Sequence, residues 1–475
     1  MFATCMRLGK IISVFFFTAI LSALLLTGPG CANIVPPSGG PRDSLPPLLI
    51  SSLPKDSATN VTIQKIVLNF DEFVELKSPS EKVLVAPYPS QPPLIESKLR
   101  SVTIRLKDSL LPNTTYVIDF GDAIADLNEG NILRNFRYVF STGNQIDSNE
   151  LTGNIVLAET GKTDSTLFAL LYRKEEDSTV AKETPPYVAR LNGKGQFRFT
   201  NLPAGTYYVY GLLDADGNKK FNQPIETFAF LDSPVVVNGA TTPVTLYAFA
   251  SEKEKKRGPA AGTGRDQIRK LIYTTNLKEN AQDLLDTLTL SYSKPLKQAD
   301  SSKIRLVEDS VLQKPLLVIN DTTRNKLLLL TSWKPGSTYN LFLDREYATD
   351  TSGLTTTAND TLQFRVKQED EYGSIRIRFK NADTLLHPVL LFYNGDQLEA
   401  SFPLTGNQFY RKLFPPGSYK LSILYDANRN GVWDPGSYFT KPRRQPERVL
   451  FLDKTITIKE NWVNETEIEQ LPQNR

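Results

Sequence analysis

The sequence predicts an all-β protein, a tandem array of four β-sandwich domains behind a short apolar N-terminal segment and a proline-rich tether. Short runs such as KIVLNF, SVTIRL and GSIRIRF alternate apolar and polar residues between Pro, Gly, Asn or Asp, which is typical of strands joined by turns. Few segments have the spacing of an amphipathic helix, and the candidate KENAQDLLDTLT from Lys278 fits equally well as a loop entering a strand. Two long motifs also occur twice, which indicates repeated domains.

The first 30 residues have the features of a secretory signal. Arg7 and Lys10 form a basic start, and residues 11–26 form a 16-residue uncharged run. This run is shorter than the ~20 apolar residues of a membrane-spanning helix. We therefore expect residues 1–30 to be a cleaved signal peptide. An uncleaved N-terminal anchor is the alternative.

The stretch GPGC places Gly30 directly before Cys31 and resembles a bacterial lipobox. That resemblance implies that the Cys31 thiol carries diacylglycerol, so the mature chain begins at a lipid-anchored (palmitate-type) cysteine. Residues 31–45 contain many prolines and cannot bury a core, which predicts an extended tether. We expect an outer-membrane lipoprotein, and the sequence leaves open which face of the membrane carries it.

The two repeated motifs define the expected domain order. PNTTY from Pro112 resembles PGSTY from Pro335, and LPAGTYYVYGLLDADGN from Leu202 resembles FPPGSYKLSILYDANRNG from Phe414. The offsets of 223 and 212 residues nearly agree, which predicts an A–B–A–B array. After the signal (1–30) and tether (31–45), the expected segments are A1 (46–146), B1 (150–250), a charged Gly-rich linker (251–265), A2 (266–369), B2 (370–461) and a C-terminal tail (462–475).

Composition argues against nucleic-acid binding and against most catalytic chemistry. Without the signal the chain has 53 basic and 52 acidic residues, so it lacks the excess of basic charge that nucleic acid requires. His387 is the only histidine, and no cysteine follows Cys31. This argues against Ser–His–Asp, Cys–His and His-ligated zinc sites. We expect no enzyme activity and no cofactor, and we interpret His387 as a packing or strand-edge residue.

Several stretches resemble known families. PPLLISSLPKDSATNVTIQKIVLNFDEFVE, LLPNTTYVIDF and FRYVFSTG resemble bacterial Ig-like domains of the S-layer (SbsA-like) type, over nearly all of A1 and more faintly over A2. GQFRFTNLPAGTYYVYGLLDADGN resembles carboxypeptidase-regulatory-like or prealbumin-like sandwiches. CANIVPPSGGPRDSLPP resembles the start of Ig-like lipoproteins from Bacteroidota. These resemblances imply adhesive, spacer or scaffold modules of the cell envelope.

A triplet of Asp, Ser or Thr, and then an apolar residue or Thr occurs ten times. It resembles the O-glycosylation signal of exported Bacteroidota proteins. The alternative is that Asp and Ser or Thr cap turns ahead of strands. The implied acceptors are Ser44, Ser57, Ser109, Ser165, Ser178, Thr287, Ser310, Thr322, Thr361 and Thr384.

The loop YDANRNGVWD has the oxygen spacing of a weak calcium site, with Gly431 at the sharp turn. Position 12 is Ser437 instead of a bidentate Glu, which predicts low affinity. The related loop LDADGNKKFN from Leu213 fits less well, because Gly217 is shifted and Lys220 adds positive charge. A hairpin of Asx turns is the alternative for both loops. The candidate calcium ligands are Asp426, Asn428, Asn430, the carbonyl of Val432, and Asp434.

Three classes of function remain. The first is a non-catalytic envelope lipoprotein that acts as a scaffold or protein-binding accessory, for example beside an outer-membrane β-barrel assembly or transport machine, with a partner that the sequence does not identify. The second is a glycan- or peptide-binding surface module, for which Trp433 and Tyr438 would be the exposed aromatic residues. Trp333 and Trp462 lie in strand-like contexts and predict core positions. An enzyme is the third and least favoured class.

Overall fold

The structure is a computed structural model that describes residues 17–18, 43–174, 178–239, 241–251, 271–320, 322–380 and 386–468. The predicted all-β class is confirmed. Among these residues no helix is long and apolar enough to cross a membrane. Cys31, most of the predicted signal and tether, and linker residues 252–265 lie outside the described part. The helical turns are short: α2 (Pro79–Lys82), α3 (Thr179–Lys182), and the 3-10 turns η2 (Ser301–Lys303) and η3 (Glu369–Glu371).

The A1 module packs two main sheets around an apolar core. Its strands alternate inward and outward residues, as in KIVLNF, where every second side chain is buried. A small third sheet completes the module. In spatial order the sheets are β1 (Leu49–Leu53), β2 (Lys65–Phe70), β6 (Ser101–Arg105) and β5 (Leu94–Lys98); β10 (Phe136–Ser141), β7 (Thr115–Gly121) and β4 (Leu84–Ala86); and β3 (Val74–Leu76), β8 (Ile124–Asp126) and β9 (Ile132–Leu133).

The B1 module has one continuous sheet folded around its own core. Its first strand pairs parallel with its last strand, and Gly153 permits this close approach because a Cβ there would lie 2.4 Å from the Val244 carbonyl oxygen. In spatial order the strands are β13 (Tyr187–Arg190), β12 (Phe168–Tyr172), β15 (Gly205–Leu212), β16 (Thr227–Phe230), β18 (Val244–Ala250), β11 (Asn149–Leu157) and β14 (Gln196–Leu202), with β17 (Val235–Val237) on β15.

The A2 module repeats the two-sheet plan of A1. The segment from Lys278 that fitted both a helix and a loop contains no helix: a two-residue strand and a turn lead into the next strand. The sheets are β19 (Tyr273–Thr275), β21 (Leu288–Tyr292), β26 (Lys326–Leu330) and β25 (Leu316–Ile319); β20 (Ala281–Gln282), β29 (Asp360–Val366), β27 (Thr338–Leu343), β23 (Ile304–Glu308) and β24 (Val311–Gln313); and β22 (Leu296–Ala299) with β28 (Ala348–Asp350).

The B2 module corrects the predicted C-terminal boundary. Residues 462–475 were expected to be a tail, but β36 (Val463–Ile468) pairs parallel with β30 (Gly373–Phe379) over its whole length. This repeats the parallel pairing of the first and last strands of B1. B2 therefore extends to at least Ile468. Its sheets are β33 (Gln408–Phe414), β30 and β36; and β32 (Gln397–Pro403), β31 (Pro388–Asn394), β34 (Gly417–Tyr425) and β35 (Arg448–Ile458).

The repeated sequence motifs are turns closed by tyrosine hydroxyls. In the A modules the hydroxyl of Tyr116 accepts a hydrogen bond from the backbone N–H of Leu111, and Tyr339 repeats this contact with Lys334. In the B modules the hydroxyls of Tyr207 and Tyr419 donate to a proline carbonyl four residues earlier. Each contact satisfies a backbone group where the chain enters a strand. The repeated motifs therefore reflect a shared way of closing a turn, and they do not mark a shared active site.

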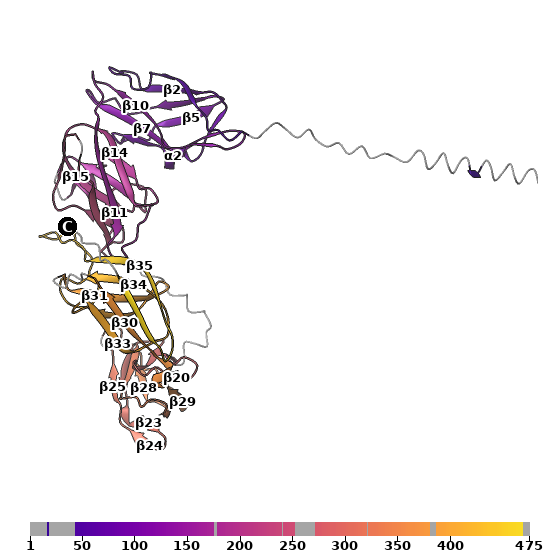
Figure 1. Ribbon diagram of the computed structural model, residues 1–475, viewed down its shortest axis with the longest axis vertical. Coiled ribbons are helices and arrows are strands. Elements are labelled where there is room, and N and C mark those ends of the chain that lie inside the picture. Colours follow the sequence, from indigo (N-terminus) through magenta and orange to yellow (C-terminus); the bar gives the residue numbers. More distant parts are fainter. Residues whose placement is uncertain are drawn as a thin grey trace, which may run out of the picture.

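The four modules follow a different order in space than along the chain. Figure 1 shows A1 at one end, then B1, then B2, with A2 at the opposite end. The strand β35 of B2 lies against B1, where the backbone N–H of Val449 donates to the carbonyl of Ala158 at 2.8 Å. The two A–B pairs are therefore joined through their B modules.

Candidate functional site

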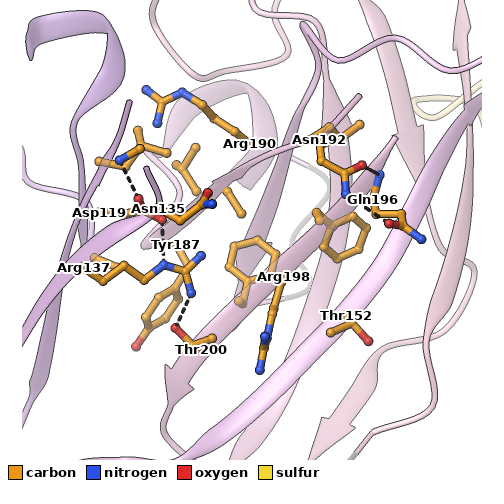
Figure 2. Close-up of a pocket in the computed structure, with 18 of the residues that line it drawn as sticks. Asp119, Asn135, Arg137, Thr152, Tyr187, Arg190, Asn192, Gln196, Arg198 and Thr200 are labelled. Carbon is orange, nitrogen blue, oxygen red and sulfur yellow. Dashed lines mark hydrogen bonds and ion pairs between the residues drawn. The ribbon is translucent and has the colours of Figure 1, made fainter. Parts of the chain in front are cut away.

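A cleft of about 990 Å³ lies between A1 and B1. It is bounded by β4 and β7 of A1 and by β13 and β14 of B1 (Figure 2). Direct contacts hold its two walls together. The backbone N–H of Tyr88 donates to the carbonyl of Pro186 at 2.7 Å, and Ala86 packs against the B1 core. The walls therefore form a fixed surface.

Three arginines give this cleft a basic lining. Arg137 forms an ion pair with Asp119 at 2.9 Å and donates to the hydroxyl of Thr200 across the junction. Arg198 forms an ion pair with Glu150 at 2.7 Å. These two guanidinium groups are therefore already neutralised by carboxylates of the protein.

Arg190 lacks such a carboxylate partner among the described residues. It donates to the backbone carbonyl of Glu81 in A1. Burial lowers the pKa of its guanidinium, and the charge of Asp119 partly opposes this shift. A partly buried guanidinium with unused donors suits a planar anion such as a carboxylate.

A second junction joins B2 to B1 through Tyr438, in the loop between β34 and β35. Tyr438 is only 2% exposed. Its ring packs edge-on against Phe228 and Phe230, with centroids 5.1 and 5.2 Å away. Its hydroxyl lies 3.2 Å from that of Tyr210. The expectation that Tyr438 forms an exposed aromatic platform is wrong, because the facing B1 sheet covers this side chain.

Polar contacts surround the inserted ring. The side-chain amide of Gln445 donates to the carbonyl of Phe230 at 3.1 Å and to Asp232 at 2.9 Å. Arg448 lies over the ring of Tyr247 at 5.2 Å. The junction thus combines a buried aromatic anchor with a polar rim, as specific protein interfaces do.

The other tryptophans also differ from expectation. Trp433 is half-buried, and its indole N–H donates to the carbonyl of Glu447 at 2.7 Å. Trp462, expected in the core, is 65% exposed because it precedes β36 in a turn and lies beside Lys459. Trp333 is 9% exposed and belongs to the A2 core, as expected.

In the predicted calcium loop, the side chains of the candidate ligands form hydrogen bonds within the loop itself. Asp426 is 2% exposed, and its carboxylate accepts from the backbone N–H groups of Arg429 at 2.6 Å, Asn430 at 3.2 Å and Gly431 at 2.6 Å. Asn430 also donates from its amide to Asp434 at 2.7 Å. These bonds are those of Asx turns.

The two asparagines complete this pattern. Asn428 donates to Asp434 at 2.6 Å and accepts from the N–H of Asn430 at 3.0 Å. The side-chain oxygen of Asn430 accepts from the N–H of Val432 at 2.7 Å. The loop is therefore a network of Asx turns, and calcium binding here stays a prediction.

Glu447 is a member of this loop that the sequence reasoning missed. Its two carboxylate oxygens accept from the N–H groups of Ala427 at 2.8 Å and Asp434 at 3.0 Å. Glu447 brings a third carboxylate to the loop, although it lies well beyond Ser437 in the sequence. Ser437 is the residue at position 12 of the calcium-loop spacing, and it offers no carboxylate. Its place in the sequence was the signal that could have identified it. Glu447 stands directly before β35, just as Glu226 stands directly before β16 in the B1 module.

None of the described glycosylation candidates is buried. Ser178 and Thr287 are half-buried, and Thr384 lies outside the described residues. Several of the preceding aspartates cap turns; Asp164, for example, accepts from the N–H of Thr166 at 2.9 Å. Seven acceptors are exposed, and the turn interpretation is supported by direct hydrogen bonds. The exposed candidates are Ser44, Ser57, Ser109, Ser165, Ser310, Thr322 and Thr361.

The single histidine lies on the surface beside the B2 loop. His387 is half-buried, and its Nε2 lies 2.9 Å from a guanidinium nitrogen of Arg429. Its backbone carbonyl lies 3.3 Å from the N–H of Asp426. These contacts support the expected strand-edge role, since His387 lies next to the start of β31.

Comparison with known proteins identifies one module. Residues 43–142 match the family model of the bacterial Ig-like domain, so the chain contains such a domain. No curated protein matches the chain.

The solved structures that match this chain share little sequence with it. The major pilin subunit BcpA of Bacillus cereus is 11% identical, with 67% of this chain and 99% of the pilin covered and a TM-score of 0.16. The TIE protein of Bacillus anthracis is 13% identical, with 91% and 76% covered and a TM-score of 0.17. The S-layer protein SbsC is 11% identical, with 89% and 54% covered and a TM-score of 0.16. These TM-scores are too low to support any argument about this chain.

Proposed function

We propose that the chain is a non-catalytic lipoprotein of the outer envelope, tethered to the outer membrane at Cys31, that acts as a scaffold or protein-binding accessory. Its modules would hold an envelope partner at a set distance and orientation, for example beside a β-barrel assembly or transport machine. Stacked sandwiches without a described catalytic constellation suit such a role.

The insertion of Tyr438 into B1 is the observation that carries this proposal. Two tandem A–B pairs joined only by a linker would move independently, which is the default for small inter-domain contacts. A buried aromatic anchor with a polar rim instead couples B1 to B2. The modules joined in this way keep one relative arrangement, which a scaffold needs and a single binding domain does not.

Co-purification from detergent-solubilised envelopes tests the proposal. The tagged chain is compared with Tyr438→Asp, which places a charge in the aromatic pocket and uncouples B1 from B2. We expect the unmutated chain to recover a defined envelope protein and the variant to lose it while each module stays folded. Equal recovery by both proteins would argue for a single-module binding function instead.

The A1–B1 cleft favours a second candidate, the peptide-binding alternative. Its observation is Arg190, which donates only to a backbone carbonyl in the described structure. An acidic side chain or a chain terminus would supply the missing carboxylate. Binding of an oligo-glutamate peptide should then weaken strongly in Arg190→Gln and be unchanged in Lys412→Gln, which alters a distant lysine of B2.

A further inference from the structure

Three carboxylates meet at one end of B1, in the loop LDADGNKKFN, whose spacing alone fits a calcium site poorly. Asp214 and Asp216 follow β15, and Glu226 stands directly before β16. One oxygen from each lies within 4.8 Å of the others. A calcium ion bonds oxygens at about 2.4 Å, so these three oxygens are close enough together to share a single ion after a small adjustment of their side chains.

Glu226 gives independent support for a missing ligand. Its side chain is 2% exposed, and one oxygen accepts from the N–H groups of Asn222 and Gln223, each at 3.2 Å. The other oxygen, Oε1, is buried and accepts no hydrogen bond from the described residues. A buried carboxylate oxygen without a donor is costly, and a bound cation removes that cost.

The charges around the cluster leave room for a divalent ion. Lys219 pairs with Asp214 and lies over the ring of Phe168. Lys220, which counted against this loop on sequence, turns away and donates to the carbonyl of Lys182 at 2.9 Å. Among the described residues the three carboxylates therefore meet one ammonium group, which leaves about two negative charges.

The remaining contacts of the cluster are local. Asp214 accepts from the N–H of Lys219 at 3.1 Å. Asp216 accepts from the N–H of Asn218 at 3.1 Å, from its amide at 2.6 Å and from the amide of Gln223 at 3.3 Å. Burial, followed by the charges of Asp216 and Asp214, raises the pKa of Glu226 despite its two backbone hydrogen bonds. These contacts leave the Oε1 oxygen of Glu226 without a hydrogen-bond donor among the described residues.

We propose that Asp214, Asp216 and Glu226 bind a hard divalent cation, with Ca²⁺ as the ligand of choice for an all-oxygen site. The ion would connect the loop after β15 to the start of β16. Phe221 lies between these points and stacks on Phe228 at 4.1 Å and on Phe439 of B2 at 5.5 Å. Calcium would thereby stiffen the B1 side of the junction with B2.

Calcium titration of the full chain tests this site, with terbium luminescence as a second readout. Asp426→Ala serves as the matched control, because it disables the B2 loop and leaves the B1 cluster intact. We expect this control to retain one calcium equivalent, and Glu226→Gln made in the same background to bind at least about tenfold more weakly. Calcium should also raise the melting temperature of the control and not that of the double variant.

Loss of all calcium binding in Asp426→Ala would overturn the proposal, and so would equal affinity after Glu226→Gln. Circular dichroism in chelator checks that each variant is folded. If Glu226→Gln does not fold, Asp216→Asn replaces it, since Asp216 is exposed and its loss removes a ligand without opening the core. Unchanged affinity in that variant would equally reject the site.

Discussion

Replacing Tyr438 by alanine should separate the two halves of the molecule. The ring is 2% exposed and contacts three aromatic residues of B1. An aromatic side chain of this kind buries roughly 150–250 Å², and aromatic-to-alanine changes in packed sites cost about 3–5 kcal/mol. Because this cost falls on the junction, we expect B1 and B2 to lose their mutual stabilisation while the four cores persist.

Calorimetry measures this effect directly. A loss of about 3–5 kcal/mol should lower the shared B1–B2 transition by on the order of 10 °C, given the size of the two modules. Tyr438→Phe keeps the ring, loses the hydroxyl that lies 3.2 Å from that of Tyr210, and should cost about 1 kcal/mol. Tyr410→Ala is the matched control, because Tyr410 is 50% exposed in the same module and its loss should be nearly neutral.

Limited proteolysis gives a second readout of the same change. Cleavage within residues 251–265 should yield two fragments. In the unmutated protein these fragments should still co-elute, because the B1–B2 contacts do not depend on the linker; in Tyr438→Ala they should separate. A Tyr438→Ala protein with the melting temperature of the Tyr410→Ala control, whose fragments stay together, would refute the reasoning.

Three further predictions concern the anchor, the B2 loop and acid stability. Cys31→Ala should leave the chain soluble or uncleaved; unchanged membrane fractionation together with an unchanged mass of the N-terminal peptide would contradict the lipid anchor. Asp426→Ala removes the acceptor of three backbone N–H groups and should destabilise B2 by about 1–3 kcal/mol without calcium. If the loop also binds calcium weakly, millimolar calcium should add about 0.4–1.4 kcal/mol to the stability of the B2 module in the unmutated protein and nothing to that module in Asp426→Ala, which thermal melts with and without chelator would measure. The hydrogen-bonded Arg365 guanidinium lowers the pKa of Glu371 from 4.5 to about 2, so this pair stabilises the fold fully above about pH 4.5 and less as the pH falls toward 2. Glu371→Gln should reduce that part of the acid dependence, and identical pH–stability curves would show that the pair contributes nothing.

The sequence by itself determined the class and the modular plan. Each sheet buries one face, so apolar and polar residues alternate along its strands and the alternation is visible in the sequence. Runs such as KIVLNF and GSIRIRF therefore indicate strands. The repeated Pro-x-x-x-Tyr and Gly-x-Tyr motifs could be recognised in the sequence because each turn is closed by contacts within a few residues. Gly205 and Gly417 have φ of 154° and 153°, a conformation that favours glycine, which explains why glycine stands at this position in both B modules.

Only the tertiary structure decided which modules touch and which side chains close the loops. Tyr438 has the same local pattern whether it is solvated or buried, and its burial depends on a B1 sheet more than 200 residues away. Glu226 and Glu447 reach their loops across excursions of different length, so a fixed ligand spacing could not reveal them. Trp462 lies next to the strand β36, yet its side chain is exposed to solvent. Strand pairing constrains only the backbone, so it does not determine which side chains a neighbouring module will cover.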